Sequence, residues 1–92
     1  MKKIIVLGST GSIGVNTLEI IRNRRDSFQV VGLSAHTDEI GIRQQVEEFS
    51  VKRWCLSGAL PDSNPSPYPG REGLLRLIGE TEADLVVNGI AG

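Results

Sequence analysis

The sequence predicts an α/β domain in which helices flank a parallel sheet of about four strands. Three observations support this class. Short apolar runs alternate with helical periodicity along the 92 residues, and such alternation is typical of parallel sheets with right-handed crossovers. The first apolar run is continuous, as expected for a strand covered on both faces. A glycine-rich turn separates this run from the first helical pattern. Together they favour a Rossmann-like arrangement.

The glycine turn spans residues 8–14 and connects a strand predicted over residues 4–7 to a helix predicted over about 12–24. Glycines let the backbone reverse within a few residues and approach a bound group closely. The first free N–H groups of the helix, at the positive end of its dipole, point into the same space. The turn therefore predicts a site for a phosphate or pyrophosphate.

The turn has the pattern G-x-x-G-x-x-G, and Ser9 stands where the common dinucleotide fingerprint has its first glycine. A Walker-type loop is disfavoured, since no Lys-Ser or Lys-Thr pair follows the glycines. The alternative is a tight turn without a ligand, in which Ser12 is a plain helix N-cap. We expect the pyrophosphate of a dinucleotide to bind the backbone N–H groups of Thr10, Gly11, Ser12 and Ile13.

Apolar stripes at helical spacing define three helices, over residues 12–24, about 39–49 and about 71–82. A glycine within the first stripe allows that helix to approach the sheet closely. Either Thr37 or Asp38 can cap the second helix. The predicted stripes are Gly14, Leu18 and Ile21, then Ile42, Val46 and Phe49, and finally Leu74, Leu77 and Ile78.

Three further strands are predicted over residues 29–34, 52–56 and 84–89, so that residues 1–92 form one domain. Residues 57–70 carry four prolines and indicate a surface loop rather than a linker, because the alternation resumes after them. The chain stops after the fourth strand, where a substrate domain is expected. We therefore expect an N-terminal fragment without its catalytic domain, whose exposed fourth strand favours self-association.

The end of the second strand distinguishes NAD from NADP. NAD enzymes carry an acid there that binds the ribose 2′-hydroxyl, whereas this chain has Ser34. His36 and Thr37 offer hydrogen bonds to a 2′-phosphate, and Asp38 would repel a phosphate that it faced. We expect residues 36–38 to contact the cofactor, with a slight preference for NADP. An exposed loop histidine and a helix cap at Asp38 are the alternatives.

Composition excludes several classes. A net charge of −1 without a basic run gives no support for nucleic-acid or membrane-surface partners, and no apolar run reaches the roughly 20 residues of a membrane span. No signal peptide is visible. The one cysteine, Cys55, is expected to be a buried structural thiol in a cytoplasmic protein. Glu47 and Glu48 are expected on a solvated face. We expect no catalytic residues and no metal ligands in this chain.

The glycine turn with its following Thr-Leu pair resembles the N-terminal part of the 1-deoxy-D-xylulose 5-phosphate reductoisomerase family. The resemblance spans essentially the whole chain, which would be the first quarter or so of such an enzyme. It rests on residues 7–14 with Thr17 and Leu18, residues 30–33 with Ala35, Phe49, Gly73, Leu74 and residues 86–92.

This resemblance implies an NADPH-dependent oxidoreductase of non-mevalonate isoprenoid biosynthesis. The family rearranges and reduces a phosphosugar, 1-deoxy-D-xylulose 5-phosphate, to 2-C-methyl-D-erythritol 4-phosphate. It implies a homodimer and a divalent metal, Mg or Mn, held in the catalytic domain beyond residue 92, so this part alone is expected to be inactive. Residues 10–13 would take the family's cofactor role. Residues 36–38 would take its 2′-phosphate role, where many members have Gly-Lys-Asn instead of His-Thr-Asp.

Two alternatives share such a turn. One is another NAD(P)-dependent reductase, such as a semialdehyde dehydrogenase or dihydrodipicolinate reductase. The other is a non-enzymatic nucleotide-sensing module, which would bind the cofactor without turnover. Residues after 92 would separate them, because a catalytic cysteine, an acidic metal cluster or a partner-binding segment would each mark one class.

Overall fold

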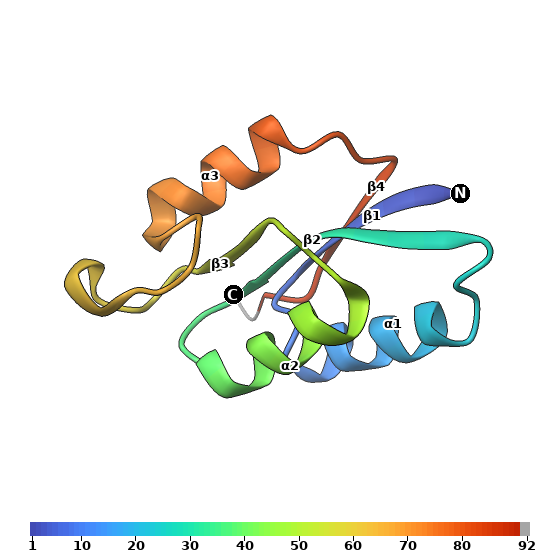
Figure 1. The fold of residues 1–92 in the computed structure, drawn as a ribbon, viewed down its shortest axis with the longest axis horizontal. Coiled ribbons are helices and arrows are strands. Elements are labelled where there is room, and N and C mark those ends of the chain that lie inside the picture. Colours follow the sequence, from blue (N-terminus) through green and yellow to red (C-terminus); the bar gives the residue numbers. More distant parts are fainter. Residues whose placement is uncertain (91–92) are drawn as a thin grey trace.

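The computed structural model describes residues 1–90. Ala91 and Gly92, which end the stretch 86–92 used for the family resemblance, lie outside the described residues. Its parallel sheet has the order β3-β2-β1-β4 (Figure 1). This confirms the predicted α/β class. The elements are β1 (Lys2–Leu7), α1 (Ser12–Arg22), β2 (Phe28–Ala35), α2 (Glu39–Phe49), β3 (Trp54–Leu56), a short 3-10 helix (Pro61–Ser63), α3 (Gly70–Glu80) and β4 (Leu85–Asn88).

The predicted helices and strands are all present, and their ends differ by a few residues. The first helix ends at Arg22 rather than near residue 24, since the N–H of Arg24 bonds to the carbonyl of Ile21 in a tighter turn. The backbone N–H of Asn23 bonds back to the carbonyl of Glu19, and its side-chain Nδ2 donates to the same oxygen at 2.9 Å. The side chain of Asn23 thus adds a second donor to a carbonyl in the last turn of the helix.

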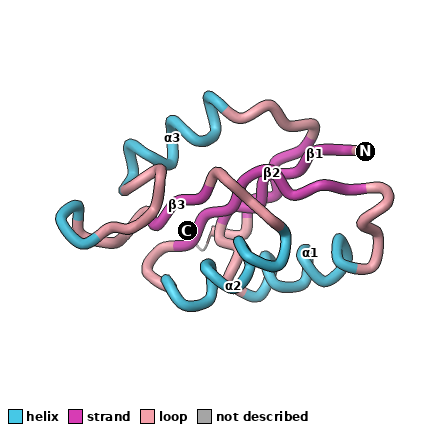
Figure 2. The backbone as a smooth tube through the Cα atoms, viewed as in Figure 1, coloured by secondary structure: helices cyan, strands magenta, loops and turns pink. Residues whose placement is uncertain are grey.

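The sheet forms the middle layer, with α1 and α2 on one face and α3 on the other (Figure 2). Side chains of a strand alternate between faces. Ile4 and Val6 of β1 accordingly belong to the core under α1 and α2, while Ile5 and Leu7 belong to the core under α3. This explains the continuous apolar run at the start of the chain, since both faces of β1 are covered.

The predicted helical stripes are mostly buried. All three positions of α1, together with Ile42 of α2 and Leu77 of α3, are buried, and Val46, Phe49 and Leu74 are half-buried. The prediction for Ile78 is wrong, because its side chain is 38% exposed. Within residues 1–90, α3 is the one helix on its face, so no neighbouring helix covers its flank.

Trp54 and Cys55 of β3 lie on opposite faces and serve packing. Trp54 belongs to the core under α2, where the guanidinium carbon of Arg43 lies 5.3 Å from the centre of its ring. Cys55 is fully buried, and its thiol donates to the carbonyl of Gly70 at 3.4 Å. Burial raises the pKa of the Cys55 thiol to about 11. The expectation of a buried structural thiol is therefore confirmed.

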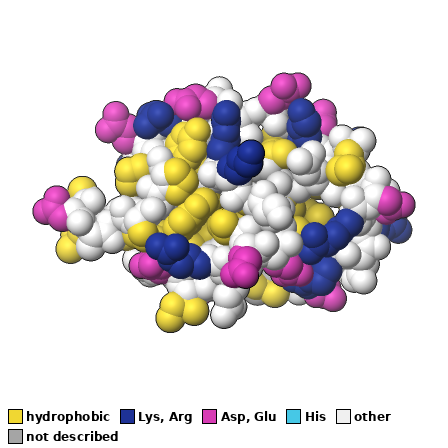
Figure 3. Space-filling view, viewed as in Figure 1, with side chains coloured by type: hydrophobic (Ala, Val, Ile, Leu, Met, Phe, Trp, Pro, Cys, Tyr) yellow, Lys and Arg dark blue, Asp and Glu magenta, His cyan; other side chains and the backbone are white. Residues whose placement is uncertain are grey.

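The surface is mixed in charge. Figure 3 shows charged side chains of both signs, with apolar side chains exposed between them on the same face. No helix formed by residues 1–90 is long and apolar enough to cross a membrane.

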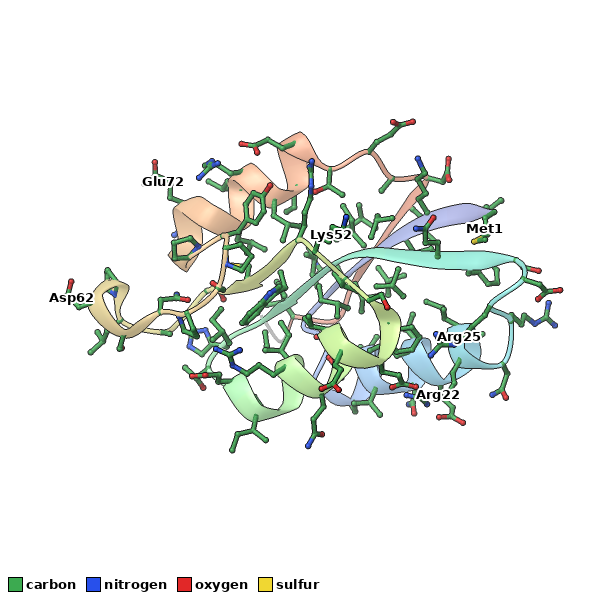
Figure 4. All side chains as sticks on the ribbon, in the orientation of Figure 1. Met1, Arg22, Arg25, Lys52, Asp62 and Glu72 are labelled. Carbon is green, nitrogen blue, oxygen red and sulfur yellow. The ribbon has the colours of Figure 1, made fainter. Side chains whose placement is uncertain are left out.

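Helices α1 and α2 are joined by a charged cluster on their outer side. Arg22, labelled with Arg25 in Figure 4, binds both carboxylate oxygens of Glu48, with 2.8 Å between Nη2 and Oε1. Arg25 lies 3.4 Å from the same carboxylate and stacks on Phe49. Glu48 is exposed as expected, but it is also paired. Its hydrogen bonds with Arg22 hold the pKa of the Glu48 carboxyl below its usual range.

Replacing this carboxylate tests the cluster. A group with a lowered folded-state pKa stabilises the fold above its ordinary pKa of 4.5, and this contribution is lost as the pH falls through the folded-state value. Glu48→Gln should therefore lower the melting temperature at neutral pH by no more than a few degrees, because exposed pairs contribute little. The difference should shrink in acid and in high salt. Glu47→Gln is the control, and an equal effect of the two variants contradicts the pairing.

The edge strand β4 exposes apolar side chains. Among the described residues it pairs with β1 alone. Leu85 and Val86, which point to opposite faces, are 51% and 44% exposed. Apolar edge strands with unpaired backbone groups promote association between chains.

We expect the 92-residue chain to self-associate through this edge. Its mass measured by light scattering should rise with concentration, and Leu85→Lys should suppress the rise, because a charged edge residue opposes strand pairing. Leu75→Lys is a matched control on α3, where the leucine is 64% exposed and away from the edge. A monodisperse monomer at high concentration contradicts the prediction.

Candidate functional site

A cleft of about 500 Å³ opens at the carboxyl ends of all four strands. Open α/β sheets bind ligands at this end, and the volume is typical of small-molecule sites. The cleft is lined by Gly8, Thr10 and Gly11 after β1, Ser34, Ala35 and His36 at the end of β2, Ser57 after β3, and Gly89 and Ile90 after β4.

Three glycines, Gly8, Gly14 and Gly89, pack backbone against backbone beside this cleft. Gly8 has a φ of +69°, which L side chains rarely adopt, and a Cβ there would lie 2.7 Å from the carbonyl carbon of Gly89. A Cβ on Gly14 would collide with the carbonyl oxygen of Gly8 and lie 2.5 Å from the Cα of Ser9. The turn, the start of α1 and the end of β4 can therefore meet only without side chains at these positions.

Hydrogen bonds to β2 fasten the turn. The N–H of Gly8 donates to Ser34 Oγ at 3.2 Å, and the N–H of Ser9 donates to the carbonyl of Ser34 at 2.8 Å. Within the turn, the N–H of Gly11 donates to the carbonyl of Gly8 at 3.2 Å. The N–H of Thr10 meets no acceptor among residues 1–90. It is thus a fixed donor available to a ligand.

The first turn of α1 supplies two more donors. Its N-cap is Gly11, which has no side chain to cap the helix, and the first turn holds no acidic residue. The N–H groups of Ser12 and Ile13 precede the first intrahelical bond and have no described acceptor. Of the four predicted pyrophosphate contacts, Thr10, Ser12 and Ile13 keep free N–H groups, while that of Gly11 closes the turn. The alternative of Ser12 as N-cap is wrong, since Ser12 is the first helical residue.

The three predicted residues after β2 have different surroundings. His36 lines the cleft, and its ring lies against the backbone of Gly58, where a side chain would collide with it. Thr37 is exposed. The Oδ1 of Asp38 accepts the N–H of Gly41 at 2.9 Å, which confirms Asp38 as the cap of α2. Asp38 lines a neighbouring groove between α1 and α2 rather than the cleft. The cofactor contacts of all three stay predictions.

Several lining residues were not predicted as site residues. In the sequence, Ser34 indicates only that the acid typical of NAD enzymes is absent. In the structure, its hydroxyl accepts the N–H of Gly8 and so fastens the turn. Ser57, Gly89 and Ile90 follow later strands. One signal could have found them, because residues directly after parallel strands meet at one edge of the sheet.

Within residues 1–90, neither a metal site nor a second ligand-binding hollow compares with this cleft. No group of three or more His, Cys, Asp or Glu side chains in this range could hold a metal ion. A hollow of about 480 Å³ lies at the amino ends of the strands, beside Lys3, Arg53 and Glu80. Helix carboxyl ends face this side, so it lacks the glycine turn and free N–H groups that bind anions.

A parallel sheet, a glycine turn and free N–H groups at the start of the first helix are typical of dinucleotide-binding α/β domains. A family model described as 1-deoxy-D-xylulose 5-phosphate reductoisomerase matches residues 4–92. The chain belongs to this family.

Relatives and solved structures agree. The chain is 37% identical to a 1-deoxy-D-xylulose 5-phosphate reductoisomerase of Thermodesulfovibrio yellowstonii, with coverage of 100% of this chain and 26% of that protein. It is 40% identical to the enzyme of Treponema denticola, with coverage of 99% and 24%. The Zymomonas mobilis enzyme in complex with NADPH superposes with a TM-score of 0.59 and 25% identity, covering 95% of this chain and 21% of that one. The chain thus spans about a quarter of its relatives' length, and none of the alternative classes is favoured.

The glycine packing can be tested with two helical glycines. Gly14→Ala places a methyl group against the turn backbone and should lower the free energy of unfolding by about 1–3 kcal/mol, the usual cost of overpacking. Gly79→Ala in α3 is the matched control, since a Cβ there meets nothing within 4 Å. It should stabilise the fold by about 0.5–1 kcal/mol through helix propensity. Urea unfolding measures both, and effects of the same sign contradict the packing argument.

Proposed function

We propose that this chain is the NADPH-binding part of a 1-deoxy-D-xylulose 5-phosphate reductoisomerase. The observation that carries the proposal is the set of three free N–H groups on Thr10, Ser12 and Ile13, beside a turn kept open by glycines. A pyrophosphate needs such donors and close backbone approach, and the positive end of α1 favours its charge. These residues fit the cofactor that the family implies.

The residues after β2 would hold the adenosine end. His36 and Thr37 provide donors for a 2′-phosphate, and no acid lines this part of the cleft as described. The carboxylate of Asp38 is occupied by the Gly41 N–H, so it contributes as the cap that shapes the loop. When bound, NADPH would supply the hydride that reduces the substrate.

The complete enzyme would convert 1-deoxy-D-xylulose 5-phosphate to 2-C-methyl-D-erythritol 4-phosphate in isoprenoid biosynthesis. We place the phosphosugar and a divalent metal with residues other than 1–92. One solved reductoisomerase of the same fold is described as a complex with NADPH, fosmidomycin and magnesium. We further propose a cytoplasmic homodimer without nucleic-acid or membrane partners.

Removing one donor tests the pyrophosphate site. Proline is well tolerated at the first helical position, and Gly11 has the extended backbone that a residue before proline requires, with φ −79° and ψ 175°. Ser12→Pro should therefore weaken NADPH binding about tenfold without lowering the melting temperature, because it removes the N–H, together with the hydroxyl, and leaves the helix intact. Ser12→Ala, which keeps that N–H, is the control for the lost hydroxyl. Unchanged affinity in Ser12→Pro contradicts the site.

Cofactor choice is tested by titrating the chain with NADPH and NADH and following the nicotinamide fluorescence. NADPH should bind several-fold more tightly, because its charged 2′-phosphate accepts stronger hydrogen bonds from His36 and Thr37 than the 2′-hydroxyl of NADH does. Equal binding of the two cofactors contradicts the NADP preference while leaving the pyrophosphate site intact.

A further inference from the structure

A glutamine of α2 reaches into the cofactor turn. The Nε2 of Gln45 donates to the carbonyl oxygen of Ser9 at 2.9 Å. Gln45 is partly buried, and Ser9 is fully buried. Among residues 1–90, this bond is the one hydrogen bond between a side chain of α2 and the backbone of the turn.

The bond fixes the direction of a ligand-facing donor. The carbonyl of Ser9 and the N–H of Thr10 belong to the same peptide group, which is planar and trans. The two groups therefore point in opposite directions. Because Gln45 holds the Ser9 oxygen toward α2, the Thr10 N–H is directed away from α2, and Thr10 lines the cleft. This N–H is one of the three free donors described above.

Stability alone does not account for a glutamine here. Its Oε1 is buried without a hydrogen-bond partner among the described residues, and so is Ser9 Oγ. A buried polar atom without a partner costs free energy that an apolar side chain of similar size would avoid. Reversing the amide would place Oε1 against the Ser9 oxygen, two acceptors that repel. The position therefore keeps a donor aimed at the turn despite that cost.

We propose that Gln45 is a positioning residue for the dinucleotide, which orients the Thr10 N–H toward the pyrophosphate through the Ser9 carbonyl. The inference rests on the proposed NADPH site. It assigns to α2 a role in binding the pyrophosphate in addition to its role in packing.

Gln45→Met tests this role, because methionine keeps the length of the side chain and removes the donor. Gln44→Met is the matched control, since Gln44 is the exposed neighbour on the same helix. The full chain is titrated with NADPH and with 2′-AMP, which has the 2′-phosphate but no pyrophosphate. Gln45→Met should weaken NADPH binding about five- to tenfold, leave 2′-AMP binding unchanged and keep the melting temperature within a few degrees. Gln44→Met should change none of these.

The outcomes separate the two proposals. Wild-type chain that does not bind NADPH overturns the proposed function and this inference with it. NADPH binding that is equal in wild type and Gln45→Met overturns the inference alone, and so does an equal loss for both ligands, which a general distortion would produce. If Gln45→Met fails to fold, hydrogen exchange in the wild-type chain decides. The Gln45 carboxamide protons should exchange much more slowly than those of Gln44, and equal rates overturn the inference.

Discussion

The close approach of Gly8, Gly14 and Gly89 is the constraint on which the site depends. The N–H of Gly89 donates to the carbonyl of Leu7 at 2.7 Å, and a Cβ on Gly89 would lie 3.0 Å from the same oxygen and 3.3 Å from the nitrogen of Gly14. Three chain segments thus share a space that admits only backbone. Because the start of α1 is pressed against the turn in this way, its free N–H groups are held in a fixed position next to the turn.

The second strand and helix hold the turn from the other side. Ser34 accepts two of its N–H groups, and Gln45 donates to one of its carbonyls. Gly41 allows the methyl group of Thr10 to approach α2, since a Cβ there would lie 3.0 Å from it. These contacts fix the turn on this side, while the N–H of Thr10 has no acceptor among the described residues. Such preorganisation lowers the entropic cost of ordering the site when a ligand binds.

The sequence allowed the elements and the glycine turn to be predicted, because both depend on local spacing. Apolar periodicity identified the core of α1, and the residues preceding α2 suggested its Asp38 cap. Contacts between distant segments could not be predicted in this way. The bond from Gln45 to Ser9 and the pairing of Glu48 with arginines of α1 depend on how helices sit over the sheet. The exposure of Ile78 likewise depends on how many helices cover that face of the sheet. The position of Ile78 in an apolar stripe does not predict this number.

Helix α2 connects the two halves of the proposed cofactor site. Its cap, Asp38, accepts the N–H of Gly41 and so fixes the loop that carries His36 and Thr37. Further along the same helix, Gln45 donates a hydrogen bond to the turn that carries Thr10. A shift of α2 along the sheet would therefore alter both the 2′-phosphate loop and the direction of a pyrophosphate donor. In the proposed site, cofactor choice and cofactor affinity would therefore be coupled through α2, although the residues concerned follow different strands.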